Sequence, residues 1–221
     1  MTKKILVLHG LAQSGDYFKS KTKGLRNELE KHGYELLYAT APNRYQPADI
    51  PDNLGEVLAN EAADSDVLAW IEDDLQHDTY RLPQTTIDYL HEFVVKNGPF
   101  EGVLGFSQGA GVAGYLMTDF NGLLTLTAEQ QPPLRFFMAF SGFRFRPEQY
   151  QSQYDRNPIS VPSLHVQGEL DTITEPFKVE QLYNSCAPDT RTFLTHSGGH
   201  YVPNSRGFAK KVIEWLQKVD K

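Results

Sequence analysis

One serine of the chain lies in a sequence context that suits nucleophilic catalysis. Ser107 is the central residue of Gly105-Phe106-Ser107-Gln108-Gly109, which has the form G-x-S-x-G. It follows an apolar run that predicts a strand and precedes a run of small residues that predicts a helix. This is the setting of a nucleophile elbow, a sharp and strained turn in which flanking glycines avoid side-chain clashes. We therefore predict that Ser107 is a nucleophile, the alternative being an ordinary turn.

A serine hydroxyl is a weak nucleophile until a base accepts its proton, and two histidines near the end of the chain could supply that base. His200 lies in the loop Ser197 to Pro203, between the last predicted strand and the last predicted helix. His196 continues the strand directly, so the pleat fixes the direction of its side chain. We predict that His200 is the base, because its loop belongs to the carboxyl end of the sheet; the alternative is a surface or core histidine.

The base needs an acid that holds the imidazole in the correct tautomer and stabilises the imidazolium. The sequence Gly168-Glu169-Leu170-Asp171-Thr172 follows the preceding predicted strand, and we choose Asp171 over Glu169 or Glu175. The alternative role of Asp171 is to cap the helix that follows. A serine, then an aspartate, then a histidine is the chain order of the α/β-hydrolase fold, and this order favours the catalytic interpretation.

Acyl transfer also requires hydrogen-bond donors for the oxyanion that forms in the transition state. In a nucleophile elbow, one donor is the backbone N–H of the residue after the serine, here Gln108, and the other comes from the loop after the first strand. That loop runs from His9 to Gly15, and the N–H of Leu11 is our candidate. We expect His9 itself to organise the loop rather than to act as a base.

The pattern of apolar runs predicts the elements that would position these residues. Six apolar runs predict strands at residues 5–8, 35–39, 102–106, 136–140, 163–167 and 190–194. Helical spacing of apolar residues predicts helices at residues 17–31, 83–96, 108–118, 177–183 and 208–218. Alternation of strands and helices predicts an α/β protein of the α/β-hydrolase class, with a doubly wound, mostly parallel sheet of about six strands. Ligands bind such sheets outside the carboxyl ends of the strands.

The segment from about Asn43 to Arg81 has no clean helical or strand period. Long irregular segments in compact domains are usually lids or binding loops, so we expect a lid-like insertion within a single domain of residues 1–221. Trp70 and Tyr80 in this segment are candidates for an apolar acyl pocket, together with Phe143 after the fourth strand. The alternative for each aromatic side chain is packing in the core.

Two arginines follow the same fourth strand and offer a different kind of contact. Arg144 and Arg146 could meet a substrate carboxylate, or they could form part of a solvated, charged face.

The charge of the chain limits the partners that it could bind. The formal net charge of -7 argues against non-specific attraction to nucleic acid or to an anionic membrane surface, since both require a basic patch. No stretch approaches the roughly 20 apolar residues that span a bilayer. We therefore expect a small-molecule acyl ester or thioester as the partner, with no membrane span, while the sequence leaves the oligomeric state open.

The single cysteine and the spacing of the histidines bear on location and cofactors. Cys186 cannot form a disulfide within the chain, which favours the cytoplasm, with the nucleus as an alternative, and we expect it to be a small apolar filler. The remaining histidines lack metal-ligand spacing, and no dinucleotide or P-loop fingerprint follows a strand. We therefore expect chemistry that needs no metal and no cofactor.

Five stretches of the chain resemble the fungal FSH family of serine hydrolases, which has an animal relative, the ovarian-cancer-associated esterase-like hydrolase. These stretches are Leu6 to Gly15, Asn97 to Gly111, Ser141 to Phe143, Val161 to Pro176 and His196 to Asn204. The resemblance implies the same three catalytic residues, Ser107, Asp171 and His200, and esterase or thioesterase activity. An acyl-protein-thioesterase-like enzyme is one alternative. A catalytically silent scaffold that binds a ligand or partner is the alternative outside the enzymes.

Overall fold

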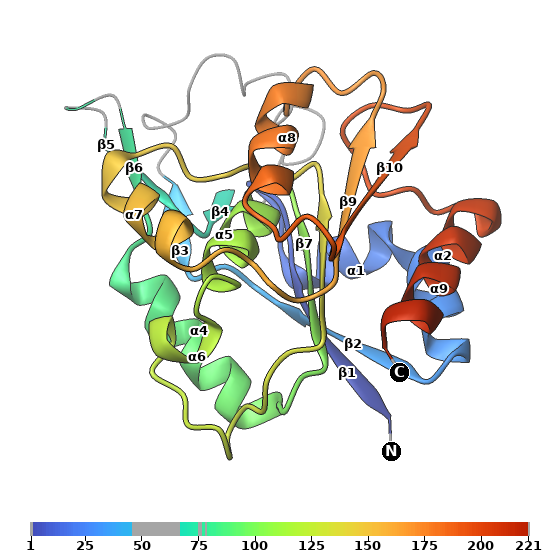
Figure 1. Cartoon of the computed structure of the whole chain (residues 1–221), viewed down its shortest axis with the longest axis horizontal. Helices are drawn as coiled ribbons and strands as arrows, with labels where there is room; N and C mark the ends of the chain where they lie inside the picture. Colours follow the sequence, from blue (N-terminus) through green and yellow to red (C-terminus); the bar gives the residue numbers. More distant parts are fainter. Residues whose placement is uncertain (1, 46–66, 75–76, 78, 221) are drawn as a thin grey trace.

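A parallel sheet forms the centre of the fold (Figure 1). The computed structural model describes residues 2–45, 67–74, 77 and 79–220. The strands of the sheet are β1 (Lys3–Leu8), β2 (Tyr34–Ala39), β7 (Gly102–Phe106), β8 (Phe136–Phe140), β9 (Ser163–Gly168) and β10 (Arg191–His196). Their order is β10-β9-β8-β7-β1-β2, and every neighbouring pair is parallel. The predicted parallel sheet of about six strands is confirmed.

The strand order reverses at β1, which places the first candidate residues side by side. β2 lies on one side of β1 and β7 on the other, with Leu8 of β1 opposite Gly105 of β7. The loop that begins at His9 and the turn at Ser107 therefore leave the same edge of the sheet from neighbouring strands. This reversal point is where open α/β sheets bind their ligands.

Helices cover both faces of the sheet (Figure 1). One face carries α1 (Gly15–Lys21), α2 (Lys23–Lys31) and α9 (Arg206–Val219); the other carries α4 (Gln84–Asn97), α5 (Gln108–Leu116), α6 (Phe120–Leu123), α7 (Glu148–Arg156) and α8 (Pro176–Asn184). Successive side chains of β1 point to opposite faces of the sheet, so the core has two parts. Ile5 and Val7 belong to the part under α1, α2 and α9, and Leu6 and Leu8 belong to the part under the other helices. A strand buried on both faces reads as a continuous apolar run, which is why it could be predicted.

Two helical regions differ from their prediction. The helix expected at residues 17–31 is divided into α1 and α2 at Thr22, whose hydroxyl donates to the Phe18 carbonyl and lies 2.7 Å from Tyr38 Oη. The α7 helix was not predicted. Its buried residues are Tyr150 and Tyr154, set in an otherwise polar segment, so its apolar period is short.

The described ends of the predicted insertion contain short strands. β3 (Asn43–Tyr45) pairs antiparallel with β4 (Val67–Ala69), and β5 (Glu72–Asp74) pairs antiparallel with β6 (Thr79–Arg81). These parts are more regular than their sequence indicates. The strands could not be predicted, because three residues are too few to show a period. The remainder of the predicted lid, residues 46–66, 75–76 and 78, lies outside the described residues. The single-domain arrangement stays a prediction.

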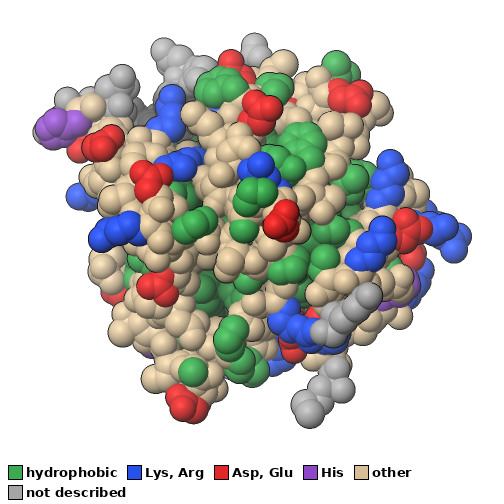
Figure 2. Space-filling model, in the orientation of Figure 1, with side chains coloured by type: hydrophobic (Ala, Val, Ile, Leu, Met, Phe, Trp, Pro, Cys, Tyr) green, Lys and Arg blue, Asp and Glu red, His purple; other side chains and the backbone are tan. Residues whose placement is uncertain are grey.

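One face of the molecule mixes charges of both signs (Figure 2). On the face shown in Figure 2, Lys and Arg side chains are interspersed with Asp and Glu rather than gathered into one basic patch. None of the helices that the structure describes is long and apolar enough to cross a membrane.

Candidate active site

Ser107 occupies a strained turn between β7 and α5. Its backbone has φ 51° and ψ -118°, a conformation that residues other than glycine rarely adopt. A Cβ added to Gly105 would lie 2.6 Å from the Ala110 nitrogen, and one added to Gly109 would overlap the Leu8 carbonyl. The two glycines therefore have the role that the sequence predicts for them.

The imidazole of His200 lies between the two other predicted side chains. Its Nε2 is 2.9 Å from Ser107 Oγ, and its Nδ1 is 2.8 Å from Asp171 Oδ2. His196, the alternative base, instead accepts the Gly198 N–H on its Nδ1. The structure thus brings Ser107, His200 and Asp171 into one hydrogen-bonded line.

Asp171 is fully buried and hydrogen-bonded through both of its oxygens. Oδ2 contacts His200, and Oδ1 accepts the N–H groups of Ile173 and Thr174 at 3.0 Å and 2.9 Å. Burial by itself raises the pKa of a carboxyl, but hydrogen bonds from His200, Ser141 and Thr174 outweigh it and hold the pKa of Asp171 below its ordinary value. The carboxylate is therefore ionised and accepts a hydrogen bond from the Nδ1–H of His200.

The other two acids considered for this position have different partners. Glu169 accepts a hydrogen bond from the Thr195 hydroxyl, and Glu175 pairs with Lys178 at 3.2 Å. Asp171 does not cap α8, whose N-cap residue is Glu175. Its second oxygen instead fixes the loop that precedes that helix.

Close backbone contact brings the loops of Asp171 and His200 together. Leu170 donates its N–H to the Gly198 carbonyl at 3.0 Å, and a Cβ on Gly168 would lie 2.6 Å from that same carbonyl oxygen. The loop containing Gly198 and Gly199 therefore makes the close approach that its glycines indicate.

The backbone N–H groups of two residues beside Ser107 are the candidate donors for the oxyanion. Leu11 and Gln108 line a cavity of about 220 Å³ together with Ser107. Within the described residues, neither of their N–H groups donates to the protein, whereas the N–H of the next residue, Ala12, donates to the Leu68 carbonyl. The donors predicted for the oxyanion thus face the same space as the serine hydroxyl.

Of the aromatic residues predicted to form an acyl pocket, Tyr80 and Phe143 line this cavity. Trp70 does not. It is completely buried, and its indole N–H donates to the His9 carbonyl at 2.9 Å, so the pocket prediction is wrong for this residue. Its backbone N–H donates to the side-chain oxygen of Gln108, which ties the insertion to the elbow.

His9 organises the first loop, as predicted. Its Nε2 accepts the Ala41 N–H at 2.9 Å, so the proton is on Nδ1, which contacts the Gly10 carbonyl. Burial lowers the pKa of His9 to about 4, which keeps the ring neutral.

Sequence reasoning missed a second cavity and one buried serine. A cavity of about 240 Å³ lies beside His200 and is also lined by Phe18, Phe106 and Tyr201. Ser141 has φ 48° and is among the hydrogen-bond partners of Asp171. Its place directly after β8, in the sequence Ser141-Gly142-Phe143, was the available signal.

The lone thiol is buried beside a histidine. Cys186 is buried, with its Sγ 3.4 Å from His165 Nε2, and burial raises its pKa to about 11. Among the residues described, no three His, Cys, Asp or Glu side chains are grouped to hold a metal ion.

Comparison with known proteins identifies the family. A family model described as "Serine hydrolase (FSH1)" matches residues 1–212. The chain belongs to this family of serine hydrolases. It is 69% identical to Family of serine hydrolases 2 from Saccharomyces cerevisiae, over 99% of this chain and 100% of that protein. It is 30% identical to Esterase OVCA2 from Danio rerio, over 97% of this chain and 96% of the relative. The resemblance noted in the sequence is confirmed.

Solved structures share the fold of this FSH1-family chain. Zea mays acyl-protein thioesterase 2 matches with a TM-score of 0.62 and 19% identity, covering 99% of this chain and 94% of that one. Arabidopsis thaliana SOBER1 matches with a TM-score of 0.64 and 18% identity, covering 100% of both chains. The predicted α/β-hydrolase fold is therefore confirmed.

Proposed function

We propose that this FSH1-family chain hydrolyses carboxylic esters or thioesters through an acyl-enzyme on Ser107. The observation that carries the proposal is the line of hydrogen bonds from Ser107 Oγ through His200 to Asp171. A base in contact with a serine and itself oriented by a carboxylate is the arrangement that nucleophilic catalysis requires. The names of an esterase and a thioesterase among the proteins similar to this chain support the substrate class.

Acylation begins when His200 Nε2 accepts the proton of Ser107 as its oxygen attacks the acyl carbon. Asp171 stabilises the imidazolium that results, without itself taking the proton. The N–H groups of Leu11 and Gln108 donate to the oxyanion of the tetrahedral intermediate. The imidazolium then gives its proton to the alcohol or thiol as the C–O or C–S bond breaks.

Deacylation repeats these steps with water as the nucleophile. His200 accepts a proton from water as its oxygen attacks the ester carbon on Ser107, and it then returns the proton to the serine oxygen. The same side chains perform both halves of the reaction, and neither half requires a metal or cofactor.

The two cavities have different places in this reaction. The cavity of about 220 Å³ contains both oxyanion donors, Leu11 and Gln108, so we assign the acyl group to it. The cavity of about 240 Å³ lies beside His200, which must protonate the leaving group, so we assign the leaving group to that side.

Steady-state hydrolysis of p-nitrophenyl esters and acyl thioesters tests the proposal. Replacement of Ser107 or His200 with alanine should lower kcat by about four to six orders of magnitude, because such groups act as a unit. His196→Gln is the matched control and should retain activity, since His196 contacts the backbone of its own loop. Activity of the folded Ser107→Ala variant within tenfold of the wild type would contradict the proposal, and an inactive wild type would favour a binding scaffold.

We also propose a cytoplasmic location, supported by the single, buried, unpaired cysteine. Cell fractionation with a tagged chain tests it, and recovery in a secreted fraction would contradict it.

A further inference from the structure

We propose that the acyl cavity recognises a carboxylate at the far end of the acyl chain, with Arg146 as its main partner and Lys178 as a second. The inference rests on the proposed function and narrows its substrates to half-esters or half-thioesters of dicarboxylic acids.

The cavity beside Ser107 is lined by positive charge without a carboxylate. Among the described residues, its lining includes Arg146 and Lys178 but no Asp or Glu. The chain as a whole has 28 acidic and 21 basic residues. A lining of average composition would therefore contain more acidic than basic side chains. An anion that enters this cavity therefore meets two basic side chains and no acidic one among the described lining residues.

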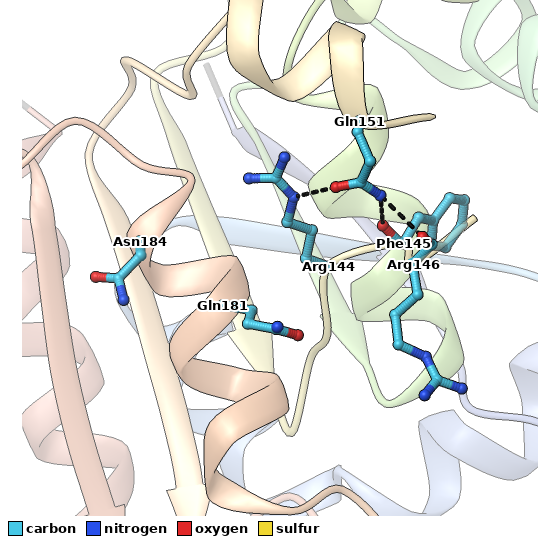
Figure 3. Close-up of a pocket in the computed structure, with 6 residues that line it drawn as sticks. All are labelled: Arg144, Phe145, Arg146, Gln151, Gln181 and Asn184. Carbon is cyan, nitrogen blue, oxygen red and sulfur yellow. Dashed lines mark hydrogen bonds between the residues drawn. The ribbon is translucent and has the colours of Figure 1, made fainter. Parts of the chain in front are cut away.

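The backbone at Arg146 is held from both sides. Its N–H donates to Tyr80 Oη at 2.8 Å, and its carbonyl accepts a hydrogen bond from Gln151 Nε2 at 3.1 Å. Figure 3 shows Gln151 also contacting the carbonyl of Phe145, so one amide group fixes two successive peptides of this loop. The base of the Arg146 side chain is therefore fixed, and Arg146 is exposed, with a side-chain hydrogen bond to Tyr80 as its neutral partner.

Arg144 and Arg146 differ in whether a carboxylate of the chain pairs with them. Arg144 forms an ion pair with Asp155 at 2.9 Å and lies over the ring of Tyr154, 4.6 Å from its centroid. In the part of the chain that the structure describes, Arg146 forms no ion pair with a carboxylate. Of the two residues that the sequence could not separate, Arg146 is the one available to a substrate.

Lys178 offers a weaker second contact. Its Nζ lies 3.2 Å from Glu175, whose side chain is 56% exposed. Surface ion pairs of this kind contribute little to stability, so a substrate carboxylate competes with Glu175 at little cost.

A second, polar cavity next to Arg146 limits how strongly the site can prefer a charged acyl chain. Arg146 also lines a cavity of about 440 Å³ with the amide side chains of Gln151, Gln181 and Asn184 (Figure 3). A carboxylate at Arg146 therefore stays partly hydrated, which limits both its desolvation penalty and its gain in affinity. We expect a preference of about tenfold, as for a partly screened pair of charges.

The test compares p-nitrophenyl monoesters of dicarboxylic acids of four to eight carbons with p-nitrophenyl esters of the matching monocarboxylic acids. The readout is the ratio of kcat/KM for the charged ester to that for the neutral ester. Intrinsic differences in ester reactivity cancel when this ratio is compared between variants. Arg146→Gln should lower the ratio by about tenfold at the optimal length, Lys178→Gln by about threefold, and Arg146→Lys should retain part of the preference.

Lys210→Gln is the matched control, because it removes one positive charge from α9, away from the site. Lys210 is exposed and pairs with Glu214 on its own helix, so its replacement should leave the ratio unchanged. Raising the salt concentration should lower the ratio in the wild type and have little effect in Arg146→Gln.

Two results would overturn the inference: an unchanged ratio in Arg146→Gln, or an equal loss of the ratio in Lys210→Gln. Failure of the proposed function is distinguishable from each of these. It would appear as absent turnover of the neutral esters, whereas turnover of neutral esters without a charge preference would overturn this inference alone.

Discussion

Asp171 contacts His200 with one oxygen and its own loop with the other. Replacing it with asparagine keeps the shape but removes the charge, and the new amide N–H₂ would favour the wrong tautomer of His200. We expect kcat for a p-nitrophenyl ester to fall by about 10⁴-fold, the loss known for this substitution in the chymotrypsin triad.

Glu169→Gln is the control for Asp171→Asn, because it neutralises an acid of the same loop whose side chain is hydrogen-bonded to Thr195 and not to His200 in the described residues. It should retain wild-type kcat. A loss of less than tenfold in Asp171→Asn, with the fold intact, would mean that Asp171 does not orient the base.

The residues of the site differ in how far the sequence could predict them. Ser107, Asp171 and His200 could be selected because chain order and strand ends restrict the choice to a few side chains. Ser141 could not, since its contact with Asp171 depends on a positive φ after β8. Arg144 and Arg146 could not be separated either, because only the fold places Asp155 beside Arg144.

The elbow between β7 and α5 depends on the absence of a Cβ at Gly105. Alanine there would place its Cβ against the backbone of Ala110, so the strand and helix would have to separate. We expect Gly105→Ala to lower the free energy of unfolding by about 3 kcal/mol, as overpacking of a tight core does. Urea denaturation followed by circular dichroism measures this change.

Gly207→Ala is the control for the elbow, because no atom lies within 4 Å of a Cβ added at Gly207. Gly207 lies in α9, where alanine should change stability by less than about 1 kcal/mol, in the stabilising direction. Equal stability of the two variants would show that the elbow tolerates a side chain at Gly105.

Elements buried on both faces were predictable, and elements with a short or mixed period were not. β7 and β8 are buried throughout, so their apolar runs indicate strands directly. The division between α1 and α2 depends on the Thr22 hydroxyl reaching Tyr38, a tertiary contact that no local pattern contains. β3 is likewise stabilised by a partner distant in the sequence, since Asn43 lies opposite Ala69 of β4.

The whole molecule should lose stability in mild acid because it buries neutral histidines. Burial lowers the pKa of His9 to about 4 and that of His165 to about 3. Below an ordinary histidine pKa of about 6.5, the unfolded chain takes up protons that these folded residues do not bind. The free energy of unfolding should therefore fall as the pH decreases from about 6.5 to about 4, by up to about 1.4 kcal/mol per pH unit for each histidine.

Urea denaturation at several pH values tests this origin of the acid sensitivity. His165→Leu should reduce the slope of unfolding free energy against pH by the contribution of about one proton, which is about 1.4 kcal/mol per pH unit. Leu164→Ala, on the same strand, should lower stability without changing the slope, since it removes a buried side chain that binds no proton. An unchanged slope in His165→Leu would mean that His165 is protonated in the folded chain.

Ser107 is the proposed nucleophile on which the function of the molecule depends, and covalent labelling tests this role most directly. The folded wild-type chain would be treated with a fluorophosphonate, digested and mapped by mass spectrometry. We predict a single phosphonyl adduct on the peptide that contains Ser107, and none on the Ser107→Ala chain. An adduct on a different residue, or no adduct on the folded wild-type protein, would contradict the claim.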